Sequence, residues 1–145
     1  MPVRVSLVAV AYADHVAAGA PHPLEIVQAA QSLGCPWLLV DTFDKSGGGL
    51  FERVTHGELA AWLAAARQGG MRIALAGSLT LHSIPNALAL NPEIIAVRGA
   101  ACPGGRDGII ARDRVSRMAR QLSTPLPSCP DTTSIQSIDE ASPRP

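Results

Sequence analysis

The fold is decided by residues 37–49, which read Trp37-Leu38-Leu39-Val40-Asp41-Thr42-Phe43-Asp44-Lys45-Ser46-Gly47-Gly48-Gly49. A run of apolar residues followed by carboxylates, a lysine and glycines predicts a strand buried on both faces that leads into a flexible loop. In α/β proteins, functional groups gather at the carboxyl ends of such strands. We therefore expect the chemistry of this chain to lie just after this strand.

Lys45 is the most chemically distinctive residue of the stretch. It is the only lysine in the chain and stands four residues after Asp41. Lysine forms Schiff bases with carbonyl substrates, because desolvation can lower its pKa and expose a neutral amine. Asp41 is placed to hold that amine or to exchange protons with it. The alternative is an ordinary loop lysine paired with Asp44.

Composition limits the class of protein. The chain has 145 residues, of which 47% are hydrophobic and 17% charged, as expected for one globular domain with a real core. Aromatic residues make up only 3%, so the core must consist of Val, Ile, Leu and Ala, as in a parallel sheet. The formal charge is zero and no segment is long enough to span a membrane. We expect a small-molecule partner and neither nucleic acid nor membrane.

Cysteine and histidine usage gives no sign of a metal site or a disulfide framework. The cysteines are odd in number and lack metal-ligand spacing, which indicates reduced thiols in a cytoplasmic protein. They are Cys35, Cys102 and Cys129. The histidines are dispersed along the chain, at His15, His22, His56 and His82. We expect no bound metal and no cofactor.

The order of strands and helices predicts an α/β fold. Residues 3–12 form a strand, an interpretation preferred to a signal peptide with a cleavage site at Ala11-Tyr12-Ala13. A helix over residues 24–33 ends at Gly34, and an alanine-rich helix over 57–67 follows the central strand. A strand at 73–76 precedes a helix that begins near Ser83, with Ser as the cap and Pro85 in the first turn. A strand at 94–97 and a helix at 112–122 complete four βα units.

The remaining residues, 123–145, are rich in Pro, Ser and Thr without an apolar period, which predicts a disordered tail after a domain of residues 1–122. Regular alternation of strands and helices implies a parallel sheet with right-handed crossovers. Two architectures fit. One is a small doubly wound sheet of the flavodoxin type, and the other is half of a (β/α)8 barrel.

Glycines after the last two strands favour the barrel. Barrels that bind phosphorylated substrates hold the phosphate on backbone N–H groups of the loops after strands seven and eight. The expected phosphate-binding residues are Gly77, Ser78, Gly99, Gly104 and Gly105. Glycines also serve as plain turn residues, and Arg98 either reinforces an anion or pairs with Asp107.

Motifs at the ends of the predicted strands resemble a known family. They are Ala11-Tyr12-Ala13-Asp14, Leu39-Val40-Asp41-Thr42-Phe43-Asp44-Lys45, Ala74-Leu75-Ala76-Gly77-Ser78-Leu79 and Val97-Arg98-Gly99-Ala100-Ala101-Cys102-Pro103-Gly104-Gly105. Together they resemble the carboxyl-terminal half of the (5-formylfuran-3-yl)methyl phosphate synthase family. The resemblance covers about residues 3–122.

The resemblance implies the second half of a TIM-barrel lyase that condenses two molecules of glyceraldehyde 3-phosphate into a furan phosphate for methanofuran or methylofuran. Its chemistry is similar to that of a class I aldolase, with an iminium formed on a lysine. Lys45 and Asp41 match active-site positions. The family's Schiff-base lysine and a second, proton-accepting lysine lie in its amino-terminal half, so the resemblance gives Lys45 a supporting role, whereas its own chemistry suggests a nucleophile.

Three functions remain open: a lyase, a module that binds a phosphorylated metabolite without turnover, and a structural partner that completes another half-barrel. A half-barrel leaves apolar edges and an apolar inner face, which natural proteins cover. We therefore expect a homo-oligomer or pairing with an amino-terminal half.

Overall fold

The computed structural model describes residues 5–123. The predicted tail therefore lies outside the described residues, except for Ser123, which is the last residue of a helix. No helix among the described residues is both long enough and apolar enough to cross a membrane.

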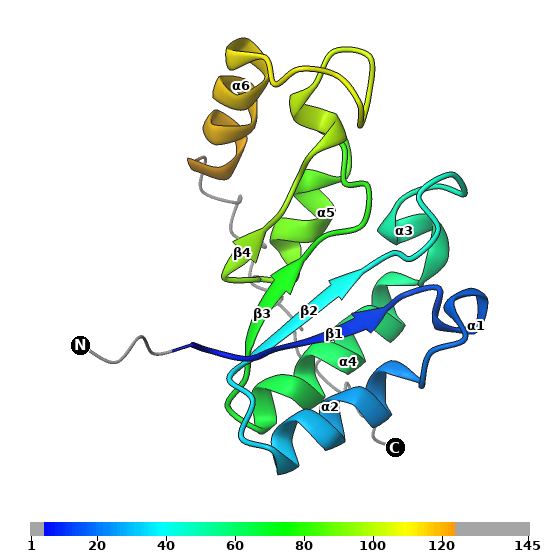
Figure 1. Ribbon diagram of the computed structural model, residues 1–145. Coiled ribbons are helices and arrows are strands. Elements are labelled where there is room, and N and C mark those ends of the chain that lie inside the picture. The colour runs from blue at the N-terminus through cyan, green and yellow to red at the C-terminus, as the bar shows by residue number, and fades with distance from the viewer. Residues whose placement is uncertain (1–4, 124–145) are drawn as a thin grey trace, which may run out of the picture.

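The described chain is an α/β fold in which four parallel strands alternate with helices, as the sequence predicts (Figure 1). The strands lie side by side in the order β1-β2-β3-β4. They are β1 (Val8–Tyr12), β2 (Trp37–Asp41), β3 (Arg72–Leu75) and β4 (Ile94–Ile95). The helices are α1 (His15–Ala18), α2 (Pro23–Ser32), α3 (Leu50–Arg53), α4 (His56–Gln68), α5 (Ile84–Ala89), the 3-10 turn η1 (Gly99–Ala101) and α6 (Arg112–Ser123).

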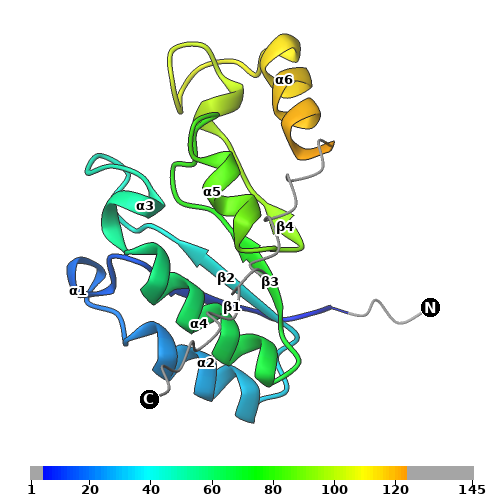
Figure 2. The ribbon, with the colours of Figure 1, turned by 180° about the vertical axis from the view of Figure 1, so that it is seen from behind.

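Helices α2, α4 and α5 cover one face of the sheet and leave the other open (Figures 1 and 2). The covered face carries the fully buried side chains of the strands, which are Ala11, Leu38, Val40, Ile73 and Leu75. Leu59 and Leu63 of α4 are also fully buried in this core. Burying a Leu or Val side chain stabilises a fold by about 1.5–3 kcal/mol, so this layer holds the domain together.

The open face carries the alternate residues of the same strands. In register across the sheet, Val10 lies beside Leu39, Leu39 beside Ala74, and Ala74 beside Ile94. Val10 is 40% exposed and Ile94 46% exposed. The prediction that β2 is buried on both faces is therefore wrong: its burial alternates, because helices pack against only one side.

Two strands are shorter than predicted. β1 begins at Val8 because its partner β2 begins at Trp37, so residues 5–7 have no strand beside them. β4 contains only Ile94 and Ile95, which pair with the end of β3. The chain then turns away before Val97, so the predicted strand at 94–97 is wrong in its second half.

The helix ends follow local chemistry. Gly34 has the left-handed backbone expected after α2, with φ +65°. The side chain of Thr55 accepts the Glu58 N–H at the start of α4. The Thr55 hydroxyl and backbone N–H donate in turn to the Glu58 carboxylate, which holds the pKa of that carboxyl below its ordinary value. Ser83 precedes α5 without making the predicted cap hydrogen bond, whereas Pro85 does lie in its first turn.

Helix α3 was not predicted from the sequence. Its first residue, Leu50, is fully buried, and the Glu52 carboxylate accepts the Gly49 N–H at 2.7 Å. This single turn draws the glycine loop back onto the domain, directly after Lys45.

Candidate functional site

Lys45 and Asp41 form an ion pair at the carboxyl end of β2. The Lys45 Nζ lies 2.8 Å from Asp41 Oδ1, and it also donates to the Thr42 backbone oxygen. A third acceptor, Thr42 Oγ1, is 3.5 Å away. A lysine ammonium has three protons, and the two closer acceptors occupy two of them, so the third can donate to a bound molecule. In this arrangement Lys45 is a held cation, with its side chain 29% exposed.

Asp41 keeps one oxygen available. Its Oδ1 accepts both the Lys45 ammonium and the Thr42 N–H, the latter at 2.7 Å. Within residues 5–123, no donor reaches Oδ2. A carboxylate has room for further hydrogen bonds at each oxygen, so Oδ2 can accept a proton or a hydroxyl from a bound molecule.

Asp44 pairs with Arg53 of α3 and not with Lys45, so the simplest alternative for Lys45, a loop ion pair with Asp44, is wrong. Arg53 Nη2 lies 2.8 Å from Asp44 Oδ2. The Ser46 hydroxyl and backbone N–H also donate to Asp44, and these hydrogen bonds, with the one from Arg53, lower the pKa of its carboxyl to about 2. The anion is the form these donors require.

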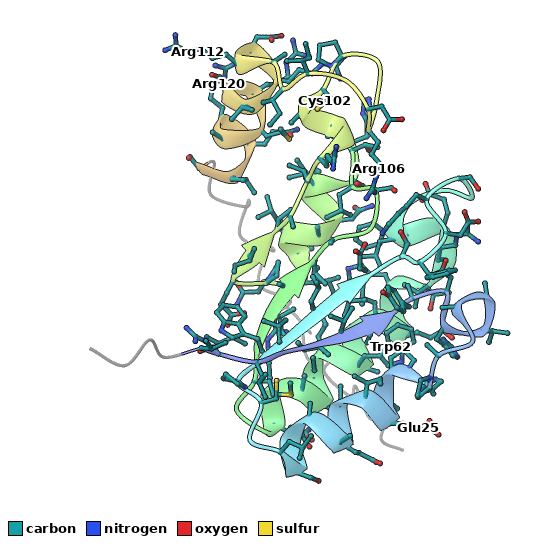
Figure 3. The ribbon with its side chains drawn as sticks, in the orientation of Figure 1. Glu25, Trp62, Cys102, Arg106, Arg112 and Arg120 are labelled. Carbon is teal, nitrogen blue, oxygen red and sulfur yellow. The ribbon has the colours of Figure 1, made fainter. Side chains whose placement is uncertain are left out.

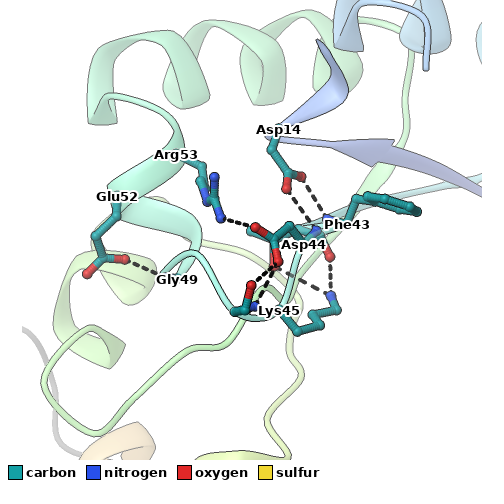
Figure 4. Close-up of polar contacts among 9 residues, drawn as sticks. Asp14, Phe43, Asp44, Lys45, Gly49, Glu52 and Arg53 are labelled. Carbon is teal, nitrogen blue, oxygen red and sulfur yellow. Dashed lines mark hydrogen bonds and ion pairs between the residues drawn. The ribbon is translucent and has the colours of Figure 1, made fainter. Parts of the chain in front are cut away.

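Asp14 joins the end of β1 to the loop that carries Lys45 (Figure 4). Its carboxylate accepts the Phe43 N–H at 2.7 Å and the Asp44 N–H at 2.9 Å. Asp14 is only 9% exposed, and burial alone would raise its pKa. The backbone N–H donors outweigh that effect and hold the pKa of Asp14 below its ordinary value. The loop between Asp41 and Lys45 is thus fixed from both strands.

Gly77 brings the loop after β3 against the loop after β2. It has φ +100°, a conformation that side chains disfavour, and an added Cβ would lie 3.0 Å from Thr42 Cγ2 and 3.2 Å from Leu50 Cβ. Its carbonyl accepts the Leu50 N–H at 2.8 Å. Only glycine allows this close approach.

A cleft of about 410 Å³ lies where these loops meet, at the end of the sheet to which the strand arrows point (Figure 1). Its lining comes from the ends of β2, β3 and β4. The charged lining residues are Asp41, Lys45, Arg98 and Arg106. The small ones include Gly77, Ser78, Gly99 and Ala100.

The structure thus brings most of the predicted site residues to one cleft. Asp41, Lys45, Gly77, Ser78 and Gly99 line it. Gly104 and Gly105 belong to the loop after η1, with φ +83° and +88°, and are not among the lining residues.

The loop after β3 has backbone N–H groups that are free to donate to a ligand. Ser78 has a left-handed φ of +49°, beside Gly77. Within residues 5–123, the N–H groups of Gly77 and Ser78 donate to no protein acceptor. Successive free N–H groups in such a turn favour an anion.

Three contributors to the site were not predicted from the sequence. Asp14 stands at a strand end but was given no role, Arg53 lies in the unpredicted α3, and Arg106 follows the recognised motif. The carboxyl-end position of Asp14 was a usable signal, whereas the placement of Arg106 depends on how the loop folds.

Metal binding has no support among the residues described. His15 and His22 do approach, with ring centroids 4.9 Å apart, but residues 5–123 hold no group of three or more His, Cys, Asp or Glu side chains suited to a metal. Cys35 and Cys102 are buried free thiols.

Fold and cleft define the class: a protein of repeated βα units with a charged cleft at the carboxyl ends of parallel strands. The family model for 4-HFC-P synthase matches residues 2–119. The chain belongs to this family.

Curated relatives agree with the family match. The (5-formylfuran-3-yl)methyl phosphate synthase of Archaeoglobus fulgidus is 32% identical over 112 residues, covering 77% of this chain and 48% of the relative. The protein of the same name from Methanocaldococcus jannaschii is 37% identical over 114 residues, again covering 77% and 48%. That of Methanothermobacter thermautotrophicus is 34% identical over 120 residues, covering 81% and 51%. The chain spans about half the length of the curated relatives it matches.

Proposed function

We propose that this chain provides the catalytic cleft of a cytoplasmic lyase of the (5-formylfuran-3-yl)methyl phosphate synthase type, which acts on glyceraldehyde 3-phosphate. The observation that carries the proposal is the held Asp41–Lys45 pair in a cleft shared with the Gly77–Ser78 turn. Two triose phosphates lose one phosphate and two waters on becoming the furan phosphate, a precursor of methanofuran or methylofuran. Such a reaction needs groups that move protons beside a site for phosphate.

Lys45 acts in this proposal as a charged donor to the substrate's carbonyl or departing oxygen. Its Nζ is held by acceptors of its own strand end, which suits a proton donor better than a nucleophile. Asp41 Oδ2 accepts the proton from the substrate. The family's Schiff-base lysine lies in its amino-terminal half. In this proposal that lysine forms the iminium, and Lys45 donates a proton to the same substrate.

The architecture proposed is the second, carboxyl-terminal half of a (β/α)8 barrel. A doubly wound sheet of the flavodoxin type has strand order 2-1-3-4 and helices on both faces. Here the order is β1-β2-β3-β4, with helices on one face only (Figure 2). Consecutive order with an open apolar face is the arrangement of barrel strands, whose inner face meets the other half.

Product formation tests the function. The chain is incubated with glyceraldehyde 3-phosphate, alone and mixed with the other half of a relative, and the furan aldehyde is followed by its absorbance. We expect product in at least one mixture, and none with Lys45→Ala. Binding of the triose phosphate without product would support a binding module instead. If neither binding nor product is observed, the remaining function is that of a structural partner.

Solution mass tests the architecture. β1 and β4 each have a neighbouring strand on one side only within residues 5–123, and the open face carries Val8, 49% exposed. We propose that four further βα units cover this face, from a second copy or from an amino-terminal half. Size exclusion with light scattering of this chain alone then gives a dimer if a second copy covers the face. It gives aggregates if the face needs an amino-terminal half that is absent. A sharp monomer with cooperative unfolding would contradict the half-barrel.

A further inference from the structure

A tyrosine stands beside the Asp41–Lys45 pair, on the neighbouring strand of the sheet. Tyr12 is the last residue of β1 and lies in register with Asp41, the last residue of β2. Side chains alternate along a strand, and the preceding residues Ala11 and Val40 are buried on the covered face, so Tyr12 and Asp41 both belong to the open face. Neighbouring strands lie about 4.8 Å apart, so Tyr12 flanks the Asp41 carboxylate from the β1 side.

The same row of the open face continues with two alanines. Beyond the ends of β3 and β4, the Ala76 and Ala96 N–H groups still donate to the preceding strands, each at 2.8 Å. Each alanine follows an open-face residue of its strand by two positions, and both line the cleft. Their methyl groups leave room beside Asp41, and Tyr12 stands at the β1 end of this row. Arg106 marks the other end of the cleft (Figure 3).

Tyr12 is part of an aromatic pair. Its ring meets the Phe43 ring edge to face, with the centroids 5.7 Å apart and the planes at 73°. The Phe43 N–H donates to Asp14 at 2.7 Å, which fixes Phe43 to the end of β1, and its ring lies on the opposite side of the loop from Arg53 (Figure 4). Phe43 is 54% exposed. The pair therefore presents ring surface next to the Asp41–Lys45 ion pair.

Aromatic residues are scarce in this chain, which has only five. Trp62 is buried among the helices on the covered side (Figure 3), and Trp37 lies at the amino end of β2 with an arginine over its ring. An exposed aromatic pair ordinarily serves as a packing surface for a neighbouring domain. Tyr12 and Phe43 differ from such a surface because they stand at the carboxyl ends of the strands, in the row of Asp41, where functional groups of parallel sheets gather.

We infer that Tyr12 and Phe43 form an aromatic wall that packs against the furan ring of the product and of the late intermediates that lead to it. The inference rests on the proposed function for the identity of that ring. Glyceraldehyde 3-phosphate has no ring, whereas the furan is planar and aromatic, so the wall makes its contact only as the ring forms. Aromatic rings attract one another beyond the burial of area, so the wall stabilises the later states of the reaction over the open-chain trioses.

Calorimetric titration of the whole chain with furan-3-ylmethyl phosphate and with oxolan-3-ylmethyl phosphate, its saturated counterpart, tests the wall. The two compounds share the phosphate and the ring size, but only the first is aromatic, and neither has a carbonyl for a lysine to attack. We expect the wild type to bind the furan compound about two- to tenfold more tightly. Equal affinities, or no saturable binding of the furan compound, would overturn the inference.

The ratio of the two affinities is the readout for the variants, because a general loosening of the cleft weakens both compounds alike. We expect Tyr12→Leu to bring the ratio close to one and Tyr12→Phe to retain it, since the second keeps a ring. Phe43→Leu should lower the ratio. Phe51→Leu is its matched control, because Phe51 lies on α3, stacks on His56 and is not among the cleft-lining residues. A wild-type ratio in a folded Tyr12→Leu protein would overturn the wall.

Product formation separates this inference from the proposed function. A preference for the furan compound that depends on Tyr12, in a chain that makes no product, would refute the lyase and leave the aromatic wall standing. Product formation by a chain that binds both compounds equally would refute the wall and leave the lyase standing.

Discussion

Removing the Asp14 carboxylate should loosen the loop that carries the site and destabilise the whole domain. The carboxylate accepts two backbone N–H groups, from Phe43 at 2.7 Å and Asp44 at 2.9 Å, and Asp14 is 9% exposed. Hydrogen bonds to a charged group contribute about 1.5–3 kcal/mol each, and part is recovered when water reaches the freed N–H groups. For Asp14→Ala we expect the free energy of unfolding to fall by about 3 kcal/mol and Tm by about 10 °C.

The assay is urea unfolding followed by circular dichroism, with Asp107→Ala as the control. Asp107 is exposed, and its side chain makes no hydrogen bond or ion pair within residues 5–123, so its loss should cost less than about 0.5 kcal/mol. The folded pKa of Asp14 is depressed, so its stabilisation is complete above the ordinary aspartate range and is lost as the pH falls through the folded pKa. The difference between wild type and Asp14→Ala must therefore shrink in acid. Equal stabilities of the Asp14→Ala and Asp107→Ala proteins at neutral pH would show that the Asp14 carboxylate does not hold this loop.

Two further substitutions test the close contact of Gly77 beside the cleft and the N-terminal cap of α2. Gly77→Ala should lower the free energy of unfolding by at least about 2 kcal/mol, because of φ +100° and the approach to Thr42, whereas Gly57→Ala, with nothing within 4 Å of its Cβ in α4, should raise it by about 0.5–1 kcal/mol. Equal effects in urea unfolding would contradict the close contact. His22→Ala should remove the acceptor of the Leu24 N–H at the start of α2 and cost about 1 kcal/mol, and thermal melts with an unchanged Tm would show that this cap contributes nothing.

The order of elements was predictable because apolar periodicity and glycine caps are local signals. The run from Trp37 to Val40 and the cap at Gly34 needed no knowledge of neighbours. Burial of β2 on one face only was not predictable in this way, since it depends on which side the helices cover. The same holds for the short β4, whose length is set by its pairing with β3.

The sequence predicted the part of the candidate site that lies within one strand end and its loop. Asp41 and Lys45 are four residues apart on one strand end, so their pairing follows from local spacing. Asp14 reaches the backbone of Phe43 and Asp44 across the sheet, and Arg53 reaches Asp44 from a helix that the sequence did not reveal. The Asp14 contacts join segments 29 and 30 residues apart in the chain, and the Arg53 contact depends on the single turn of α3, which neither period nor motif encodes.

The proposed function requires that the cleft beside Asp41 and Lys45 binds a triose phosphate through its reacting end. Calorimetric titration of glyceraldehyde 3-phosphate into wild type and Lys45→Ala tests it most directly, with far-ultraviolet circular dichroism to verify the fold and Arg112→Ala as the control. We expect Lys45→Ala to weaken binding at least about tenfold, through the loss of one charge-assisted hydrogen bond, while the spectrum stays unchanged. An affinity equal to wild type in a folded Lys45→Ala protein would contradict this role of Lys45 and leave it as an ordinary loop lysine.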